Sequence, residues 1–347
     1  MRFRKFTATF AFAIGLLAAM TGACGGDDGA VAPEGVDSGV PGSDADPNPT
    51  EGGTTTPDGS SPDSSSSPKC AGKTGAVGAR TVTITSGGLE RRFALHVPAK
   101  YDATKRTPLV FMFHGYSMSA SAIATATHFA DTADKRGMIV AYPEGTGALQ
   151  GFNAGECCGT ASSSKVDDLG FTRDMLAKLD AEYCVDEKRV FSTGFSNGGF
   201  LSYLLACELS DKIAAIAPVS GVIGFDPATC KPKRPVPVLH IHGTGDGVVP
   251  YTGGGLGNSR AVALTVDAFK AKNGCAAGAG KVVFTKGDVS CTSWAPCTAG
   301  ADVQLCAVTG GGHQWPGGDP LPYGGSPSPN LIASEAIADF FDAHPMP

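Results

Sequence analysis

The sequence predicts an α/β fold, in which a mostly parallel, doubly wound sheet is covered by helices and begins with an antiparallel hairpin. Two observations indicate this fold: short, almost continuous apolar runs, and helix-like stretches that separate them. Continuous apolar runs are typical of strands buried on both faces, and their alternation with helices indicates parallel βαβ units. The apolar runs are 109–113, 138–141, 190–192, 213–219 and 238–241, and the helix-like stretches are 120–136, 167–183, 200–209, 260–273 and 331–343.

A hairpin is predicted ahead of the first buried strand. Residues 80–85 and 92–97 alternate between apolar and polar side chains, and Ser86-Gly87-Gly88 stands between them. Alternation with a period of two indicates strands with one exposed face, and glycines are typical of the turn between antiparallel strands. We therefore expect this hairpin at the N-terminal edge of the sheet. A further apolar run at 303–308 predicts a strand near the C-terminus.

The first 23 residues are typical of an export signal. The basic sequence MRFRK precedes an apolar run at 6–20, and small residues then precede Cys24. This run is shorter than the about 20 residues that cross a membrane as a helix, which favours a signal peptide (1–23) over a membrane anchor. Cys24, followed by Gly-Gly-Asp-Asp, resembles the acylated cysteine of a bacterial lipoprotein. We expect export, either with a lipid at Cys24 that tethers the chain to a membrane or with full secretion.

The segment 24–69 is predicted to be a disordered linker. It consists mainly of Gly, Ser, Thr, Pro and Asp, with nine acidic residues and one basic residue. Such a composition buries too little apolar surface to offset the entropy of ordering. The linker accounts for the acidity of the chain, whose net charge is -6, and leaves residues 70–347 close to neutral. We therefore expect one domain at 70–347, without a basic patch for nucleic acid.

Eleven cysteines in an exported chain indicate disulfides. Ten remain without Cys24, an even number that allows complete pairing within the domain. Proximity in the sequence favours Cys207 with Cys230 and Cys275 with Cys297, and the other partners stay open. A structural zinc site is less favoured, because no CxxC pair occurs.

Ser196 lies in a candidate nucleophile turn. Residues 194–198 read Gly-Phe-Ser-Asn-Gly and stand between the strand-like run 189–193 and the helix-like run 200–209. A strand, G-x-S-x-G and a helix, in that order, form the nucleophile elbow of α/β-hydrolases, whose sharp turn exposes the serine hydroxyl. The five-residue pattern indicates little by itself in a chain with 48 glycines, so its setting carries the prediction.

A serine nucleophile requires a histidine base, which in this fold follows the serine and the acid in the chain. His313 and His344 are the histidines far enough downstream. His313 follows the strand-like run 303–308 in a glycine-rich loop, where a base is expected, whereas His344 lies at the end of the chain. We therefore predict that His313 is the base.

Asp246 is the predicted acid that orients this base. It follows the strand-like run 236–241 by a short turn, and active sites of parallel sheets assemble at such carboxyl ends. Asp226 is the reserve candidate. His240 and His242 share one face of the same strand and could form a metal site with Asp246, but the favoured interpretation is packing and hydrogen bonding beneath the acid loop. No metal is predicted.

The oxyanion of the reaction requires N–H donors. The backbone N–H of Asn197, directly after the nucleophile, is one candidate. The second is the N–H of Tyr116, in the His-Gly-Tyr loop that follows the strand-like run 109–113. Trp315 and Tyr251 are expected to line the substrate cleft.

Six segments together resemble the secreted α/β-hydrolase family of feruloyl esterases and polyhydroxybutyrate-depolymerase-like esterases. They occur in family order across residues 80–347, and the resemblance implies the same Ser196, Asp246 and His313 as catalytic residues. It also implies structural roles for Cys157-Cys158-Gly159, through a disulfide, and for Val166-Asp167-Asp168, through a helix start. The segments are FMFHGYSMSA, AYPEGT, FNAGECCGTASSSKVDDLGF, RVFSTGFSNGGFLSYLLAC, VLHIHGTGDGVVPY and GGGHQWPGG.

The chain departs from this family at two positions beside the expected oxyanion loop. Tyr116 stands where many relatives carry a smaller residue or cysteine, and Met118 replaces a common glutamine. We therefore expect Met118 to contact the substrate and the acyl preference to differ.

These observations predict a serine carboxylic-ester hydrolase with an acyl-enzyme intermediate and no cofactor. The resemblance implies feruloyl or acetyl esters of plant polysaccharide as substrates, so the partner would be a polymer-linked ester. The alternative is a depolymerase of polyhydroxybutyrate or a similar polyester, and a weaker one is a surface binding domain without catalysis. We expect a monomer.

Overall fold

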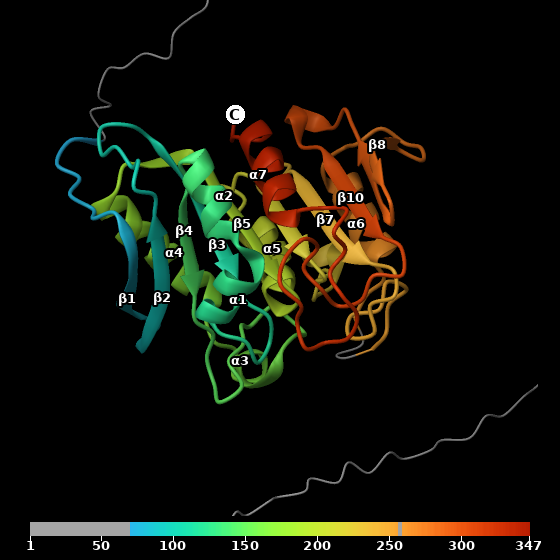
Figure 1. Cartoon of the computed structure of the whole chain (residues 1–347), viewed down its shortest axis with the longest axis horizontal. Helices are drawn as coiled ribbons and strands as arrows, with labels where there is room; N and C mark the ends of the chain where they lie inside the picture. The colour runs from blue at the N-terminus through green and yellow to red at the C-terminus, as the bar shows by residue number, and fades with distance from the viewer. Residues whose placement is uncertain (1–69, 256–258) are drawn as a thin grey trace, which may run out of the picture. The chain divides into compact units, whose positions relative to one another are not determined.

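The computed structural model describes residues 70–255 and 259–347, so the predicted signal peptide, the linker and Cys24 lie outside the described residues. The described chain forms a ten-stranded sheet with helices on both faces (Figure 1). The strand order is β1-β2-β4-β3-β5-β6-β7-β10-β9-β8. The strands are β1 Gly78–Ser86, β2 Leu89–Val97, β3 Thr107–Phe113, β4 Ile139–Pro143, β5 Val185–Phe195, β6 Ile216–Val219, β7 Val238–Gly243, β8 Lys281–Lys286, β9 Val289–Trp294 and β10 Val303–Val308.

The centre of the sheet is parallel and its two edges are antiparallel, which confirms the predicted fold class. β4, β3, β5, β6, β7 and β10 pair in parallel, and β1–β2 form the predicted hairpin, with Ser86 opposite Leu89. Gly87 and Gly88 make its turn with φ of 56° and 77°, a region that glycine enters without a Cβ clash. The hairpin β8–β9 at the other edge was not predicted, because β8 is exposed along its length and has no buried face.

Helices cover the two faces of the sheet as separate groups. α4, α5 and α6 pack on one face, whereas α1, α2 and α7 pack on the other, and in Figure 1 α2 and α7 stand in front of the sheet. β3 supplies both cores, because Phe111 faces the first group and Val110 the second. Among the described helices, none is both long and apolar enough to span a membrane. The helices are α1 Ala120–Thr127, α2 Phe129–Arg136, α3 Gly159–Ser163, α4 Asp168–Glu182, α5 Asn197–Glu208, α6 Val262–Lys272 and α7 Ala333–Ala343, with short 3-10 turns at Pro227–Thr229 and Thr298–Gly300.

The single helix predicted at 120–136 is two helices in the structure. The break lies at His128, whose φ of 50° is left-handed. The carbonyl oxygens of Ala126 and Thr127 accept hydrogen bonds from the Asp319 N–H (2.8 Å) and the Ser334 hydroxyl (2.7 Å) instead of continuing the helix. Contacts with the distant C-terminal segment therefore override the local helical pattern.

Ten cysteines form five disulfides in the described domain. The two pairs predicted from proximity, Cys207–Cys230 and Cys275–Cys297, are confirmed. The structural roles implied for the two family segments are also present, because Cys157 and Cys158 pair with each other and the Asp167 side chain caps α4 by accepting from the Gly170 N–H (2.7 Å). The remaining pairs are Cys70–Cys184 and Cys291–Cys306.

Candidate active site

Ser196 occupies a sharp turn between β5 and α5. Its φ of 52° and ψ of -117° lie in a region that non-glycine residues rarely adopt, and such a conformation costs on the order of 1–3 kcal/mol. The turn is held from both sides, because the Ser196 N–H donates to the Val219 carbonyl (2.9 Å) and the Ser196 carbonyl accepts from the Phe200 N–H (3.0 Å). The serine side chain stays partly exposed at the end of the sheet.

Two glycines make this turn possible. A Cβ at Gly194 would lie 2.6 Å from the Gly198 carbonyl carbon, and a Cβ at Gly198 would collide with the Phe113 carbonyl oxygen at the end of β3. The elbow therefore requires glycine on both sides of Ser196, because α5 begins in direct contact with the neighbouring strand end.

Asp246 lies in the loop after β7 and is 4% exposed. One carboxylate oxygen, Oδ1, accepts from the N–H groups of Val248 and Val249 (2.8 Å each), and the other, Oδ2, accepts from His313 Nδ1 (2.7 Å). Burial acts to raise the pKa of Asp246, but hydrogen bonds and charge interactions with His242 and His313 outweigh it and hold the pKa well below its usual value. Asp246 is therefore a fixed carboxylate.

His313 lies in the loop after β10, next to the Asp246 loop. The two loops are joined by hydrogen bonds from the Gly245 N–H to the Gly311 carbonyl (2.9 Å) and from the Gly310 N–H to the Thr244 hydroxyl (2.8 Å). Because a carboxylate only accepts hydrogen bonds, His313 Nδ1 must carry a proton, and a neutral ring then leaves Nε2 with a lone pair that can take a proton.

Phe195 contacts His313 and directly precedes Ser196. The Phe195 ring lies 4.6 Å from the His313 ring between centroids. The residues that the structure describes form no direct hydrogen bond between the serine hydroxyl and His313. Such bonds are often long without substrate and shorten in the complex.

The loop after β3 lies directly against the serine. A Cβ on Gly115 would lie 3.4 Å from Ser196 Cβ and 3.0 Å from Met118 Sδ, so both side chains border this glycine. His114 fixes the loop, because its Nδ1 donates to the Gly115 carbonyl (2.7 Å) and its Nε2 accepts from the Gly145 N–H (2.9 Å). Burial lowers the pKa of His114 to about 4, so the ring is neutral at pH 7.

The two residues predicted to supply oxyanion donors, Tyr116 and Asn197, have backbone N–H groups that are unpaired in the described chain, and their side chains are held by different contacts. Within the described residues, the backbone N–H groups of Tyr116 and Asn197 have no hydrogen-bond partner. The Asn197 side chain is buried and bridges to Phe152, donating to its carbonyl (3.1 Å) and accepting from its N–H (2.7 Å). The Tyr116 ring packs against Gly151 and Gly159. Both N–H groups can therefore donate a hydrogen bond to a ligand without breaking an existing one.

One predicted cleft residue, Trp315, is wrong, and the cleft role of Tyr251 stays a prediction. Trp315 is 0% exposed and its indole N–H donates to the Ser334 hydroxyl (3.2 Å), so it is a core residue beneath α7 and cannot line a cleft. Tyr251 is partly buried with its ring edge-on to His242, 5.9 Å between centroids. The reserve acid Asp226 caps the 3-10 turn Pro227–Thr229, away from His313.

The structure adds residues that the sequence did not single out. The Tyr323 ring stands edge-on to His313, with centroids 5.4 Å apart. Tyr203 on α5 donates its hydroxyl to His240 Nδ1 (2.6 Å). The next link, from His240 Nε2 to His242 Nδ1, is 3.0 Å long, so both histidines of the considered metal site are engaged with each other. Tyr203 lies in one of the six family segments but carried no predicted role, and Tyr323 lies outside all six.

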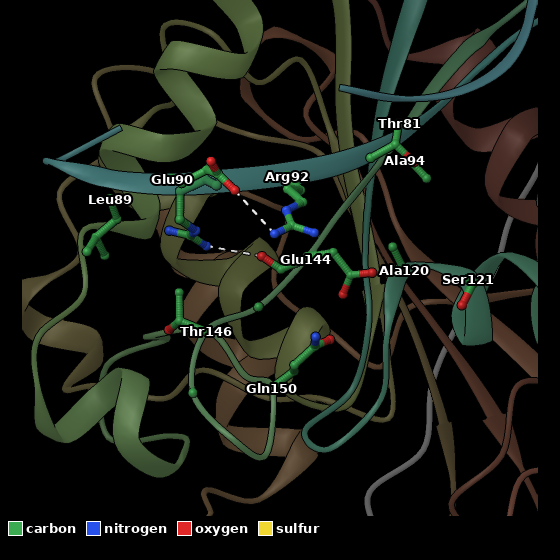
Figure 2. Close-up of a pocket in the computed structure, with 13 residues that line it drawn as sticks. Thr81, Leu89, Glu90, Arg92, Ala94, Ala120, Ser121, Glu144, Thr146 and Gln150 are labelled. Atoms are coloured by element: carbon green, nitrogen blue, oxygen red, sulfur yellow. Dashed lines mark hydrogen bonds and ion pairs between the residues drawn. The ribbon is translucent and has the colours of Figure 1, made fainter. Parts of the chain in front are cut away.

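A cavity of about 680 Å³ adjoins the loop that carries Tyr116. It lies between β1–β2, the start of α1 and the turn after β4, and Figure 2 shows Glu144 between Arg92 and Gln150. Gln150 links the cavity to the loop, because its carbonyl accepts from the Ser117 N–H (2.8 Å). With its amide nitrogen turned toward the acceptors, its side chain donates to the Met118 carbonyl (3.1 Å) and to Glu144 Oε2 (2.6 Å).

The sequence is similar to curated esterases. Residues 91–231 match the family model described as Esterase PHB depolymerase. Feruloyl esterase B of Piromyces equi is 34% identical over 235 residues, which cover 64% of this chain but only 42% of that relative's length. A probable feruloyl esterase C of Aspergillus terreus is 30% identical over 271 residues, which cover 75% of this chain and 87% of the relative.

The fold is also found among solved structures. The acetyl xylan esterase from Aspergillus awamori superposes with a TM-score of 0.54 at 14% identity, and the match covers 76% of this chain and 99% of that one. At this identity the likeness shows the fold alone. The sequence match over most of the Aspergillus terreus relative, with the family-model match, establishes that this chain belongs to the family of feruloyl esterases and Esterase PHB depolymerase domains.

Proposed function

We propose that this chain is a serine carboxylic-ester hydrolase that forms an acyl-enzyme at Ser196. The observation that carries the proposal is the buried Asp246–His313 pair (2.7 Å) in the loops next to the Ser196 turn. A strained serine turn, a histidine with its Nδ1 bound to a carboxylate and free N–H donors are the parts of acyl transfer. The names of the relatives, feruloyl esterases, support the same reaction class.

In the proposed mechanism, His313 Nε2 takes the proton of the Ser196 hydroxyl as the serine oxygen attacks the ester carbonyl. Asp246 stabilises the imidazolium that forms, through the bond to Nδ1. The tetrahedral intermediate collapses, the ester C–O bond breaks, and His313 gives its proton to the departing alcohol. Water then attacks the acyl carbon while His313 takes a proton from the water. The bond between this carbon and the Ser196 oxygen breaks, and His313 returns the proton to the serine, which leaves as the free hydroxyl.

The backbone N–H groups of Tyr116 and Asn197 would bind the oxyanion in both halves of this reaction. Their positions support this role. The Tyr116 loop borders the serine at Gly115, and Asn197 begins α5, whose N-terminal N–H groups favour negative charge. Neutral His114 and the Asn197 side chain would keep both donors in place before substrate arrives.

We infer feruloyl or acetyl esters on plant polysaccharide as the substrate class. The relatives' names support this choice, and the cavity beside the loop offers carboxylate, guanidinium, amide and hydroxyl groups that can bind sugar hydroxyls. If the cavity holds the sugar, Arg92→Ala should raise the KM for a feruloylated oligosaccharide and leave the KM for methyl ferulate unchanged. The description of the matching family, Esterase PHB depolymerase, favours the alternative, a polyhydroxybutyrate depolymerase.

We also propose that the chain is exported and acts as a monomer, with Cys24 as the lipid attachment site. The five disulfides in the described domain support an oxidising compartment. Labelled fatty acid should be incorporated by the wild type and not by Cys24→Ala. Incorporation that survives this substitution refutes the lipid site.

The central test measures hydrolysis of methyl ferulate, p-nitrophenyl acetate and polyhydroxybutyrate by the wild type and Ser196→Ala. The wild type should hydrolyse at least one of the three, and the variant should lose at least about 10³-fold in kcat. Ser192→Ala, which removes a buried hydroxyl from the same strand, is the matched control and should keep its activity. A wild type that is inert on all three substrates supports the binding-domain alternative, and an active Ser196→Ala refutes the mechanism.

A further inference from the structure

Three buried side chains form a hydrogen-bonded chain that ends at the acid loop. Tyr203 lies on α5, seven residues after Ser196, and its hydroxyl bonds to His240 Nδ1 on β7 (2.6 Å). His240 Nε2 bonds to His242 Nδ1 (3.0 Å), and His242 Nε2 reaches the Val249 carbonyl (2.8 Å). His242 Nε2 also lies 3.4 Å from Asp246 Oδ2, the oxygen that binds His313.

The acceptors in this chain determine where every proton lies. A carbonyl oxygen only accepts, so His242 Nε2 must carry a proton and donate it to Val249. In a neutral His242, Nδ1 then accepts from the His240 Nε2–H. His240 Nδ1 therefore accepts from the Tyr203 hydroxyl, which is a donor. All bonds of the chain point from Tyr203 toward the acid loop.

Burial disfavours charge on His240 and on Tyr203. Tyr203, His240 and His242 are at most 1% exposed. Burial holds the pKa of His240 well below its usual value and raises the pKa of Tyr203. The ionisable groups that face the two histidines are Tyr203 from α5, and Asp246 and Tyr251 from the loop after β7.

We propose that His242 is a positioning residue for Asp246 and that Tyr203 and His240 fix His242 as the neutral tautomer with its proton on Nε2. This inference rests on the proposed esterase function of the same site. In that tautomer His242 offers an N–H to the carboxylate and holds the Val249 end of the acid loop. With the proton on Nδ1 instead, a lone pair would face both the Val249 carbonyl and Asp246 Oδ2, and repulsion would move the carboxylate away from His313.

The first experiment reads the tautomer in the wild type, without any substitution that could disturb folding. Nitrogen-15 NMR of histidine-labelled protein should show His242 with its proton on Nε2 and none on Nδ1 at neutral pH. His242→Gln assigns the signals among the seven histidines. A proton on Nδ1, alone or in a doubly protonated ring, overturns the proposal whether or not the protein hydrolyses esters.

The second experiment measures kcat and KM for p-nitrophenyl acetate in variants of the chain. His242→Phe keeps a ring but no N–H, and should lower kcat about 10–100-fold, as loss of a side chain that orients a catalytic group does. KM should stay unchanged, since the chain is buried away from substrate. His242→Gln restores an N–H donor and should recover most of kcat, and Tyr203→Phe should lower kcat about 5-fold, the value of one hydrogen bond.

The matched control is Tyr183→Phe, which removes a tyrosine hydroxyl that donates to the Ala76 carbonyl (2.8 Å) outside the site. It should keep wild-type kcat. The proton NMR resonance of the His313 Nδ1–H should shift in His242→Phe and Tyr203→Phe but not in the control. If the chain variants lose stability yet keep kcat and this resonance, the chain is a packing feature and the proposal fails. An inert wild type with the expected tautomer would refute the esterase function instead.

Discussion

Acid should destabilise this protein through His114, which holds the loop against Ser196. The imidazole is buried, and both nitrogens are engaged, with the Gly115 carbonyl and the Gly145 N–H. Burial lowers the pKa of His114 to about 4, and the bond to Gly115 offsets this effect only in part. In an unfolded chain the same side chain titrates near about 6.5. At a pH between these two pKa values, His114 is protonated in the unfolded chain and neutral in the folded protein.

The sign and size of the effect follow from this difference in proton binding. Stability rises with pH wherever the unfolded state holds more protons, so stability is greatest above about pH 6.5 and falls as the pH drops toward about 4. A tenfold change in an equilibrium constant corresponds to about 1.4 kcal/mol, so the separation of the two pKa values corresponds to about 3 kcal/mol. That is a large part of the about 5–15 kcal/mol by which domains are stable.

The assay is urea unfolding between about pH 7 and pH 4 for the wild type and His114→Gln. Glutamine keeps an acceptor for the Gly145 N–H but does not titrate. The free energy of unfolding of the wild type should fall by about 3 kcal/mol more than that of the variant. His240, whose pKa burial also lowers, contributes to both proteins and cancels. His128→Gln, which removes a half-exposed histidine, is the control and should keep the wild-type slope. Equal losses in wild type and His114→Gln would refute the reasoning.

Three further changes test the packing around the site. The Tyr142 hydroxyl is buried with no hydrogen-bond partner in the described chain, so Tyr142→Phe should leave the free energy of unfolding unchanged or raise it by about 1 kcal/mol in urea unfolding; a loss above about 1 kcal/mol would contradict this. Asp168 and Arg91 form an ion pair (2.7 Å) with both side chains at most 3% exposed. Asp168→Asn should therefore lower that free energy by about 3–5 kcal/mol, and the double variant Arg91→Met/Asp168→Leu by less, because no charge stays buried alone; a double variant less stable than the single one would refute this. Replacing Cys207 and Cys230 by alanine should cost about 3 kcal/mol, since their disulfide closes a loop over a separation of 23 residues, and an unchanged melting temperature would contradict it.

The sequence predicted the sheet well because its signals are local. Continuous apolar runs marked the central strands, and these are the strands buried on both faces. The errors fall where tertiary contacts decide. α5 begins at Asn197, whereas the sequence predicted a start at 200. The prediction missed the first turn because it contains Gly198 and Gly199, which are poor helix formers in isolation. Glycine is required at both positions because β3 and the Gly221 region approach closely. The break at His128 likewise depends on Asp319 and Ser334, about 200 residues away in the chain.

The candidate site was predictable to the extent that it lies at strand ends. Asp246 and His313 follow β7 and β10, and these strands are parallel neighbours in the sheet, so their loops meet at one edge. Trp315 was misplaced because an aromatic residue two positions after a site histidine has the same appearance in sequence whether it faces the cleft or the core. In the structure it is completely buried and donates to Ser334, which no motif connects to it.

The least predictable part of the site is the direction of its hydrogen bonds. The spacing of His240 and His242 fits either metal ligation or a hydrogen-bonded pair. Only their partners in the structure distinguish the two: a tyrosine hydroxyl at one end and a carbonyl at the other. Those partners come from α5 and from the loop after β7, and α5 is also the helix that Ser196 precedes. One helix therefore carries the Asn197 N–H at its start and the Tyr203 hydroxyl six residues later, so a shift of α5 would disturb both the proposed oxyanion donor and the proposed orientation of the acid.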